Sequence, residues 1–288
     1  MGIEELYVMN YGETFKEIRL SRKYSIEALA DPSVSKSTIS RFERLESNIT
    51  FNKLVVLLNK MQVSLGEFSF LCEKVSGENS LNLLPKLIME KNLEELKKLM
   101  NQMWSAYEED QIIYRKVSAV LIEMHYNQLV NKPTEEEKLL FLTDYLFQCE
   151  VWTQFDLFIL GNAIEYLPQN ASIILTKELT KKTSLFHGNR LIFETVINIL
   201  VNTSLVCIKE SRLPVAQELI SNLQALDIDE TYFFERTLIN FVMGSYLAKS
   251  GNIIEGERKV NVALNVMNIL GAKKLEENFR EFYEIYIR

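Results

Sequence analysis

Apolar residues recur along the chain at the three- and four-residue spacing of amphipathic helices, and no stretch keeps the alternation of a strand. Only 10 glycines and 5 prolines interrupt the 288 residues. The pattern therefore predicts an all-α protein. Near the N-terminus it predicts five helices, over residues 12–22, 25–30, 36–44, 51–61 and 64–71. Ser25, Ser35 and Ser64 stand where helix N-caps are expected, and Glu67 completes a capping box with Ser64.

After a polar stretch at residues 74–80, the expected helices form pairs. Turn-like residues precede an amphipathic helix at Asn92, at 132–133, at 170–172, at 212–214 and at Asn252, about 40 residues apart. A longer and more apolar helix comes before each turn, as in residues 155–167. Helix pairs at this period are typical of an α-solenoid, which wraps a concave surface. We therefore expect a helix-turn-helix domain at 1–72, a linker at 73–80, and a tetratricopeptide-like repeat domain at 81–288.

Residues 25–44 divide into an apolar side, which includes Leu29, Val34 and Ile39, and a polar side. The outward residues of the third helix are Lys36, Ser37, Thr38, Ser40 and Arg41. A DNA-recognition helix needs this division, because its first turns meet base edges in the major groove while its back packs on the domain. The basic residues at the end of the first helix are expected to hold phosphates; they are Arg19, Arg22 and Lys23. The alternative is a small helical bundle with a solvated face.

The charge is unevenly distributed along the chain. The net charge of −7 disfavours nucleic-acid binding when it is considered alone. Residues 14–60, however, hold nine basic side chains against five acidic ones, a net charge of +4. A locally basic module is therefore joined to an acidic remainder, which fits DNA binding by the module only.

The sequence shows no pattern of catalytic or metal-binding residues. Zinc-ligand spacing is absent among the cysteines (Cys72, Cys149 and Cys207) and the histidines (His125 and His187). The three scattered cysteines favour reduced thiols in a cytoplasmic protein. No phosphate-binding loop, nucleophile elbow or dinucleotide motif occurs. No run of about 18 apolar residues indicates a membrane span. We therefore expect no enzyme activity, no cofactor, no metal and no membrane partner.

The segment from Ile18 to Phe68 is similar to the XRE-type helix-turn-helix of the Rgg/MutR regulators. The motif SKSxxSRFERxE at residues 35–46 carries this resemblance, and residues 152–162 and 233–252 extend it over nearly the whole chain. It implies a five-helix, lambda-repressor-like domain in a homodimeric, cytoplasmic transcription factor of a Gram-positive bacterium, bound to a double-stranded DNA operator. Leu45 departs from the glycine common in the family, and we expect it to avoid left-handed helical geometry.

The resemblance also implies that the repeat domain binds a short, often hydrophobic signalling peptide, as in quorum sensing. The candidate contacts are Asn162, Ile192, Asn198, Asn202, Phe234, Arg236 and Asn240. Asn162 and Asn202 are 40 residues apart, at equivalent positions of successive units. Asparagine can both donate to and accept from an extended peptide backbone, and arginine can pair with a carboxylate. The alternative is that each asparagine is a hydrogen-bonded packing residue.

Two functions stay open at this point. The first is a sequence-specific transcription factor that is switched by a peptide, either as an activator or as a repressor. The alternative is a helical-repeat scaffold that binds a protein partner, with a helix-turn-helix not used for specific DNA recognition. Specific operator binding would separate the two.

Overall fold

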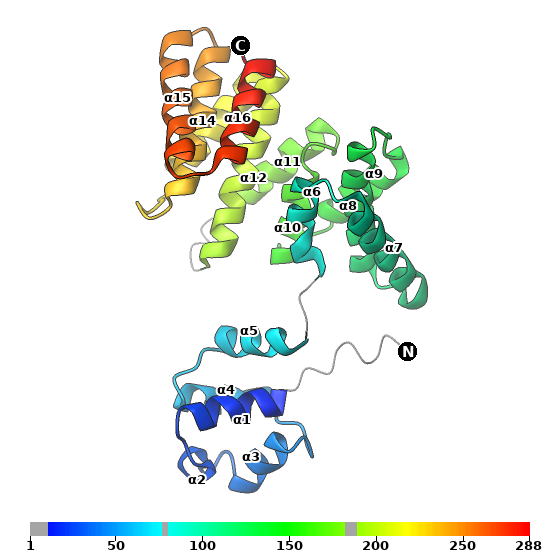
Figure 1. Cartoon of the computed structure of the whole chain (residues 1–288), viewed down its shortest axis with the longest axis vertical. Coiled ribbons are helices and arrows are strands. Elements are labelled where there is room, and N and C mark those ends of the chain that lie inside the picture. Colours follow the sequence, from blue (N-terminus) through cyan, green and yellow to red (C-terminus); the bar gives the residue numbers. More distant parts are fainter. Residues whose placement is uncertain (1–10, 77–79, 182–188) are drawn as a thin grey trace. The chain divides into compact units, whose positions relative to one another are not determined.

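The computed structural model describes residues 11–76, 80–181 and 189–288, and these residues contain helices and turns but no strand. A single β-bridge joins Asp31 to Val34 inside a turn. The chain forms two compact units, Met1–Pro85 and Lys86–Arg288 (Figure 1). The predicted all-α fold is confirmed. The finer boundaries 1–72, 73–80 and 81–288 stay predictions, and residues 77–79 of the expected linker lie outside the described residues.

The first unit contains the five expected helices within its described residues. They are α1 (Tyr11–Ser21), α2 (Ile26–Leu29), α3 (Lys36–Glu43), α4 (Phe51–Lys60) and α5 (Leu65–Ser76). The three predicted N-caps are confirmed. Ser25 Oγ accepts from the Ala28 N–H at 3.1 Å, and Ser35 Oγ accepts from the Thr38 N–H at 3.2 Å. Ser64 and Glu67 form the reciprocal capping box, with N–H···O distances of 3.1 and 2.7 Å.

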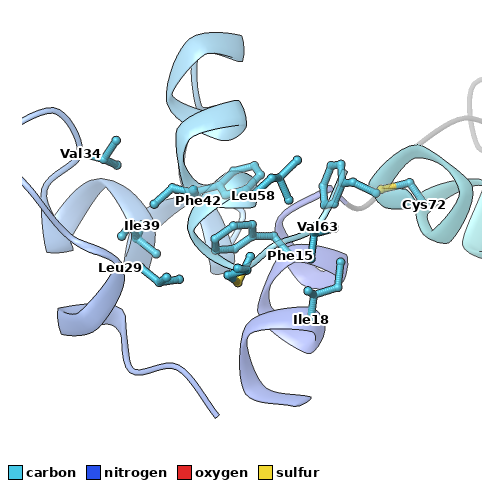
Figure 2. Packing of buried hydrophobic residues seen from close by; sticks show 12 residues of the cluster. Phe15, Ile18, Leu29, Val34, Ile39, Phe42, Leu58, Val63 and Cys72 are labelled. Atoms are coloured by element: carbon cyan, nitrogen blue, oxygen red, sulfur yellow. The ribbon is translucent and has the colours of Figure 1, made fainter. Parts of the chain in front are cut away.

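The core of the first unit gathers apolar side chains from all of α1 to α5 (Figure 2). Phe15 of α1 and Phe42 of α3 lie with ring centroids 5.7 Å apart. Leu29 and Val34, on either side of the turn between α2 and α3, are fully buried in the same core. Each such side chain contributes about 1.5–3 kcal/mol by leaving water. This packing holds α3 by its apolar side and leaves its polar side outward.

The end of α3 corrects the prediction for Leu45. Leu45 has φ +61°, which is left-handed helical geometry. Its N–H donates to the Phe42 oxygen at 3.1 Å, and the Glu46 N–H donates to the Arg41 oxygen at 2.9 Å. These are the hydrogen bonds that close a helix C-terminus through a left-handed residue. They satisfy otherwise free carbonyls and offset a steric cost of about 1–2 kcal/mol, so leucine adopts the geometry that favours glycine.

The second unit is a stack of helix pairs. The 3-10 turn η2 (Ser80–Leu83) and helix α6 (Leu84–Met89) lead from the first unit into it. The helices that follow are α7 (Leu93–Asp110), α8 (Ile113–Leu129), α9 (Glu136–Phe147), α10 (Gln154–Ala163), α11 (Gln169–Thr180), α12 (Arg190–Lys209), α13 (Leu213–Ala225), α14 (Phe233–Lys249), α15 (Ile253–Ile269) and α16 (Lys273–Tyr286). Helix α8 packs on α10, α10 on α12 and α12 on α14. We call these four helices the first-helix row.

Most of the predicted turns precede a helix as expected. Asn92 caps α7, Arg212 precedes α13 and Asn252 precedes α15. The turn predicted at residues 170–172 is wrong, because these residues lie in the first turn of α11. Pro168 is the N-cap there, with φ −50°, so the change of direction comes before Gln169. Asn-Ala-Ser indicates a turn only by composition, whereas proline removes a donor and stops the preceding helix.

Helix α12 is long and apolar enough to cross a membrane by length and composition, and α4 with α5 passes the same test as a pair bent by 104°. However, 61% of its apolar window is buried inside the protein. Helix α12 packs against α10, α11, α13 and α14, and this central place in the stack accounts for its composition.

Helices α14 and α15 pack closely through two glycines that the sequence did not single out. A Cβ added to Gly256 would lie 2.5 Å from the Ala248 backbone nitrogen. A Cβ added to Gly244 would lie 2.8 Å from the Gly256 oxygen. Real Cβ atoms do not approach backbone so closely, so both positions need glycine for α14 and α15 to touch.

Candidate functional site

The predicted recognition helix α3 has the expected two sides. Ile39 and Phe42 are buried, while Ser37 and Arg41 are exposed and Thr38 is half-buried. Ser40 is also half-buried. Among the described residues, Arg41 has no ion-pair partner, so its guanidinium is free to meet a phosphate or a guanine edge.

Lys36, at the start of α3, forms an ion pair with Glu27 of α2, and both side chains are mostly exposed. The hydrogen bond from this lysine lowers the pKa of the Glu27 carboxyl. Exposed pairs of this kind contribute little to stability, because water screens them and ordering both side chains is costly. Lys36 therefore stays available to exchange Glu27 for a DNA phosphate.

Arg19 corrects the predicted phosphate contacts, because its guanidinium is buried and fully paired. Its Nε and one terminal nitrogen donate to the two Glu43 oxygens, at 2.6 and 2.8 Å. The other terminal nitrogen donates to the Tyr24 oxygen at 2.7 Å. The hydrogen bonds to Glu43 raise the pKa of Arg19. Arg19 thus ties α1 to α3 and is not free for DNA, whereas Arg22 and Lys23 are exposed.

A second polar contact holds the turn between α2 and α3, and sequence reasoning missed it. Lys60 of α4 donates to Asp31 Oδ2 and to the Leu29 oxygen, each at 2.6 Å. Asp31 also accepts from the backbone N–H groups of Ser33 and Val34, at 2.7 and 3.0 Å. Lys60 and these donors hold the pKa of the Asp31 carboxyl well below its usual range. The Asp-Pro-Ser turn signal was visible, but its partner 29 residues later was not.

Four of the seven predicted peptide contacts lie on α10 and α12. The Asn162 amide donates to the Phe158 oxygen at 2.8 Å, so part of its capacity is used within its own helix. Asn198 is half-buried, and its Oδ1 is buried without a partner among the described residues. Asn202, one turn further along α12, is exposed. Ile192 is half-buried near the start of the same helix.

The other predicted contacts lie on α14. Phe234 is 46% exposed and Arg236 is exposed. Asn240 donates to the Lys259 oxygen of α15 at 2.9 Å. Arg236 and Asn240 line a cavity of about 280 Å³ between α13 and α14. The structure therefore divides the seven predicted residues between different surroundings instead of gathering them in one cavity.

A larger cavity of about 410 Å³ lies where the ends of α10 and α12 meet α16. Of the predicted residues, Asn202 lines it. Sequence reasoning missed the contribution of α16, which supplies Asn278, Phe279 and Phe282. The aromatic spacing of α16 was visible in the sequence, but it indicated only an apolar helix face. The cavity combines apolar walls with side-chain amides, which suits a peptide more than a small ion.

The histidine of the repeat unit is a packing residue. His125 is buried, and its Nδ1 lies 3.0 Å from the Tyr166 hydroxyl. Burial lowers the pKa of His125 to about 4, so it is neutral at pH 7. His187 lies outside the described residues. Within residues 11–76, 80–181 and 189–288 no group of three or more potential metal ligands is found.

Two family profiles match the sequence. Residues 81–281 match "HTH-type transcriptional regulator Rgg, C-terminal domain", and residues 15–68 match a helix-turn-helix family.

Solved structures have the same architecture. The Streptococcus dysgalactiae SHP pheromone receptor Rgg2 is 29% identical with a TM-score of 0.81, covering 95% of this chain and 98% of that one. A putative transcriptional regulator from Listeria monocytogenes EGD-e is 19% identical with a TM-score of 0.81, covering 96% and 97%. The PrgX/cCF10 complex is 17% identical with a TM-score of 0.67, covering 96% and 91%; the last two show the fold alone. With its Rgg-type repeat domain and its helix-turn-helix, this chain belongs to the Rgg family of transcriptional regulators.

Proposed function

We propose that the protein is a sequence-specific DNA-binding transcriptional regulator whose activity is switched by a short signalling peptide, as in quorum sensing of a Gram-positive bacterium. The observation that carries the switch is the cavity between α10, α12 and α16, where apolar walls and side-chain amides occur together. Such a surface can bind the backbone and the side chains of a short peptide at once. Rgg2, similar over nearly its whole length, is described as a pheromone receptor.

The proposed DNA contacts come from α3 and the end of α1. Ser37, Thr38, Ser40 and Arg41 would read base edges, with Lys36 reaching a phosphate after it leaves Glu27. Arg22 and Lys23 would hold further phosphates. In the proposed cytoplasmic homodimer, two copies of α3 would meet half-sites about one helical turn, or a multiple of it, apart. Peptide binding would shift the dimer between two arrangements that differ in the placing of these helices.

Genome-wide DNA binding by the purified protein at two salt concentrations tests the first part. We expect one enriched motif with the wild-type protein, and its loss in the Lys36→Ala/Arg41→Ala variant. The matched control is Lys97→Ala/Lys181→Ala, which removes two exposed lysines of the repeat unit and should keep the motif. Binding that salt weakens without any sequence preference would instead support the scaffold alternative.

A peptide-binding measurement tests the second part. The probes are synthetic peptides encoded by short reading frames beside the bound sites, labelled with fluorescein and titrated with the full-length protein. We expect Asn202→Ala to weaken binding about tenfold, because an unpaired peptide group is then left in the cavity. Arg236→Ala should change it little. Loss of peptide binding in the Arg236→Ala variant alone would instead assign the peptide to the cavity between α13 and α14.

A further inference from the structure

We infer that α16 forms one wall of the peptide pocket, and that the pocket selects a peptide carrying an apolar side chain beside a positively charged group. The inference rests on the proposed peptide binding and specifies its chemistry. It concerns the cavity of about 410 Å³ between α10, α12 and α16. The apolar part of the cavity comes from Leu205 and Val206 of α12 on one side and from Phe279 and Phe282 of α16 on the other.

Three side-chain amides from three separate elements converge on this cavity. Gln169 comes from the start of α11, Asn202 from α12 and Asn278 from α16. Among the described residues, none of the three has a side-chain hydrogen-bond partner, in contrast to Asn162 and Asn240. Each amide can donate and accept, so together they match the alternating N–H and C=O groups of an extended peptide. Without partners in the described part of the chain, these amides are free to bind a ligand backbone.

The charges of the cavity indicate what the peptide carries. Glu165 and Glu210 line it, and neither has an ion-pair partner in the described part of the chain. Lys209 also lines the cavity, but its ammonium lies 4.4 Å from the centroid of the Tyr286 ring. The C-caps of α10 and α12, Ile164 and Glu210, both belong to the lining, so two negative helix ends face the same space. This arrangement favours an ammonium or guanidinium group over a carboxylate.

Helix α16 is held firmly enough to act as a wall. The Phe279 ring packs against Phe241 of α14 with centroids 4.8 Å apart, and Tyr283 contacts the same ring at 6.4 Å. Lys249 of α14 donates to the Tyr286 oxygen at 2.6 Å. At the other end, Lys274 donates to the Met89 oxygen, the last residue of α6, at 2.7 Å. Helix α16 therefore spans from α6 to α14, and Figure 1 shows it in red beside α12 and α14.

The test is a selection from a library of random octapeptides on the immobilised full-length protein, in two arms with free or acetylated N-termini. We expect the wild-type protein to enrich peptides that combine a large apolar residue with a positive charge. If the charge is a lysine or arginine side chain, it appears in both arms. If it is the terminal ammonium, enrichment is confined to the free arm. Enrichment of acidic peptides, or of uncharged acetylated ones, would overturn the charge assignment.

Two double variants separate the inference from the proposed function. Asn278→Ala/Phe282→Ala should bind the selected peptide at least about tenfold more weakly. Glu165→Gln/Glu210→Gln should lose the preference for basic peptides, and wild-type binding should weaken with salt. The matched control Asn268→Ala/Ile285→Ala changes exposed positions on α15 and α16 outside the cavity. Circular dichroism and DNA binding report folding of each variant.

The outcomes are distinguishable. Wild-type affinity in a folded Asn278→Ala/Phe282→Ala variant would remove α16 from the pocket and leave peptide binding itself intact. Failure of the wild-type protein to enrich any octapeptide would contradict the proposed function together with the inference.

Discussion

Helices α3 and α12 both present polar residues beside an apolar side. The surroundings of these polar residues are set by nearby residues in α3, but by residues far away in the sequence in α12. In α3 the i, i+3 spacing of Ile39 and Phe42 alone assigns the inward side, and its outward residues follow. In α12, the surroundings of Asn202 depend on α10 and α16, which come from distant parts of the sequence. The outward side of a short binding helix can therefore be predicted from neighbouring residues. A cavity in a repeat stack cannot, because its walls come from distant parts of the sequence.

The two units also differ in how they use buried polar groups. The first unit ties α1 to α3 with a paired charge, Arg19 with Glu43, and so fixes the surface that α3 presents. The repeat unit instead surrounds the buried Asp156 with the neutral donors Tyr145 and Thr153, and it keeps the buried His125 neutral. Each of the following predictions acts on one unit and leaves the other as its reference.

The largest expected effect is on the buried ion pair of the first unit. Arg19→Ala should lower the free energy of unfolding by about 3–5 kcal/mol, because Glu43 is left buried and unpaired. Arg44→Ala removes an exposed pair with Glu46 and should cost about 1 kcal/mol or less. Urea unfolding followed by circular dichroism measures both. Equal effects from the two changes would show that Arg19 is not desolvated in solution.

Acid should weaken the repeat unit before the first unit. The folded pKa of His125, about 4, lies below its ordinary value, so its stabilising effect is complete above that ordinary value and is lost as pH falls toward 4. The expected loss is about 3 kcal/mol at pH 4. The depressed pKa of Asp31 acts likewise, but only below pH of about 4, where aspartate ordinarily protonates.

Hydrogen exchange at pH 7, 5.5 and 4.5, resolved by peptide, measures this difference. Protection in α8 and α10 should fall before protection in α3 and α4. His125→Gln should remove most of the change between pH 6.5 and 4.5. If protection still falls with pH in this variant, the pH dependence comes from a titrating side chain other than His125.

A smaller effect is expected at the close contact of α14 with α15. Gly256→Ala should destabilise the repeat unit by about 1–3 kcal/mol, because its Cβ meets the Ala248 backbone and the helices must separate. Gly66→Ala in α5 is the control, since its added Cβ has nothing closer than Ser64 Oγ at 4.0 Å. That change should be neutral or slightly stabilising. Thermal unfolding of both variants measures the change in stability. An unchanged unfolding midpoint for Gly256→Ala would contradict the close packing of α14 on α15.

The smallest effect is expected at the end of α3. Leu45→Gly should stabilise the first unit by about 1 kcal/mol, because glycine adopts φ +61° without the steric cost that leucine bears. The Leu45 side chain is 52% exposed, so little burial is lost. Urea unfolding against wild type measures the change. The Leu45 side chain lies beside Gly12 of α1, and destabilisation would mean that this contact outweighs the backbone strain.

The sequence by itself determined the five N-terminal helices, their serine caps and the two sides of α3, because helix period and capping depend on residues within four positions of each other. It also determined the pairing of helices in the repeat unit. Only the tertiary structure decided that Arg19 is buried against Glu43, that Leu45 closes α3 in left-handed geometry, and that Asn202 shares a cavity with α16 while Arg236 does not. These features arise from packing and from hydrogen bonds whose net energies are small, and which of them form depends on what the whole fold brings into contact.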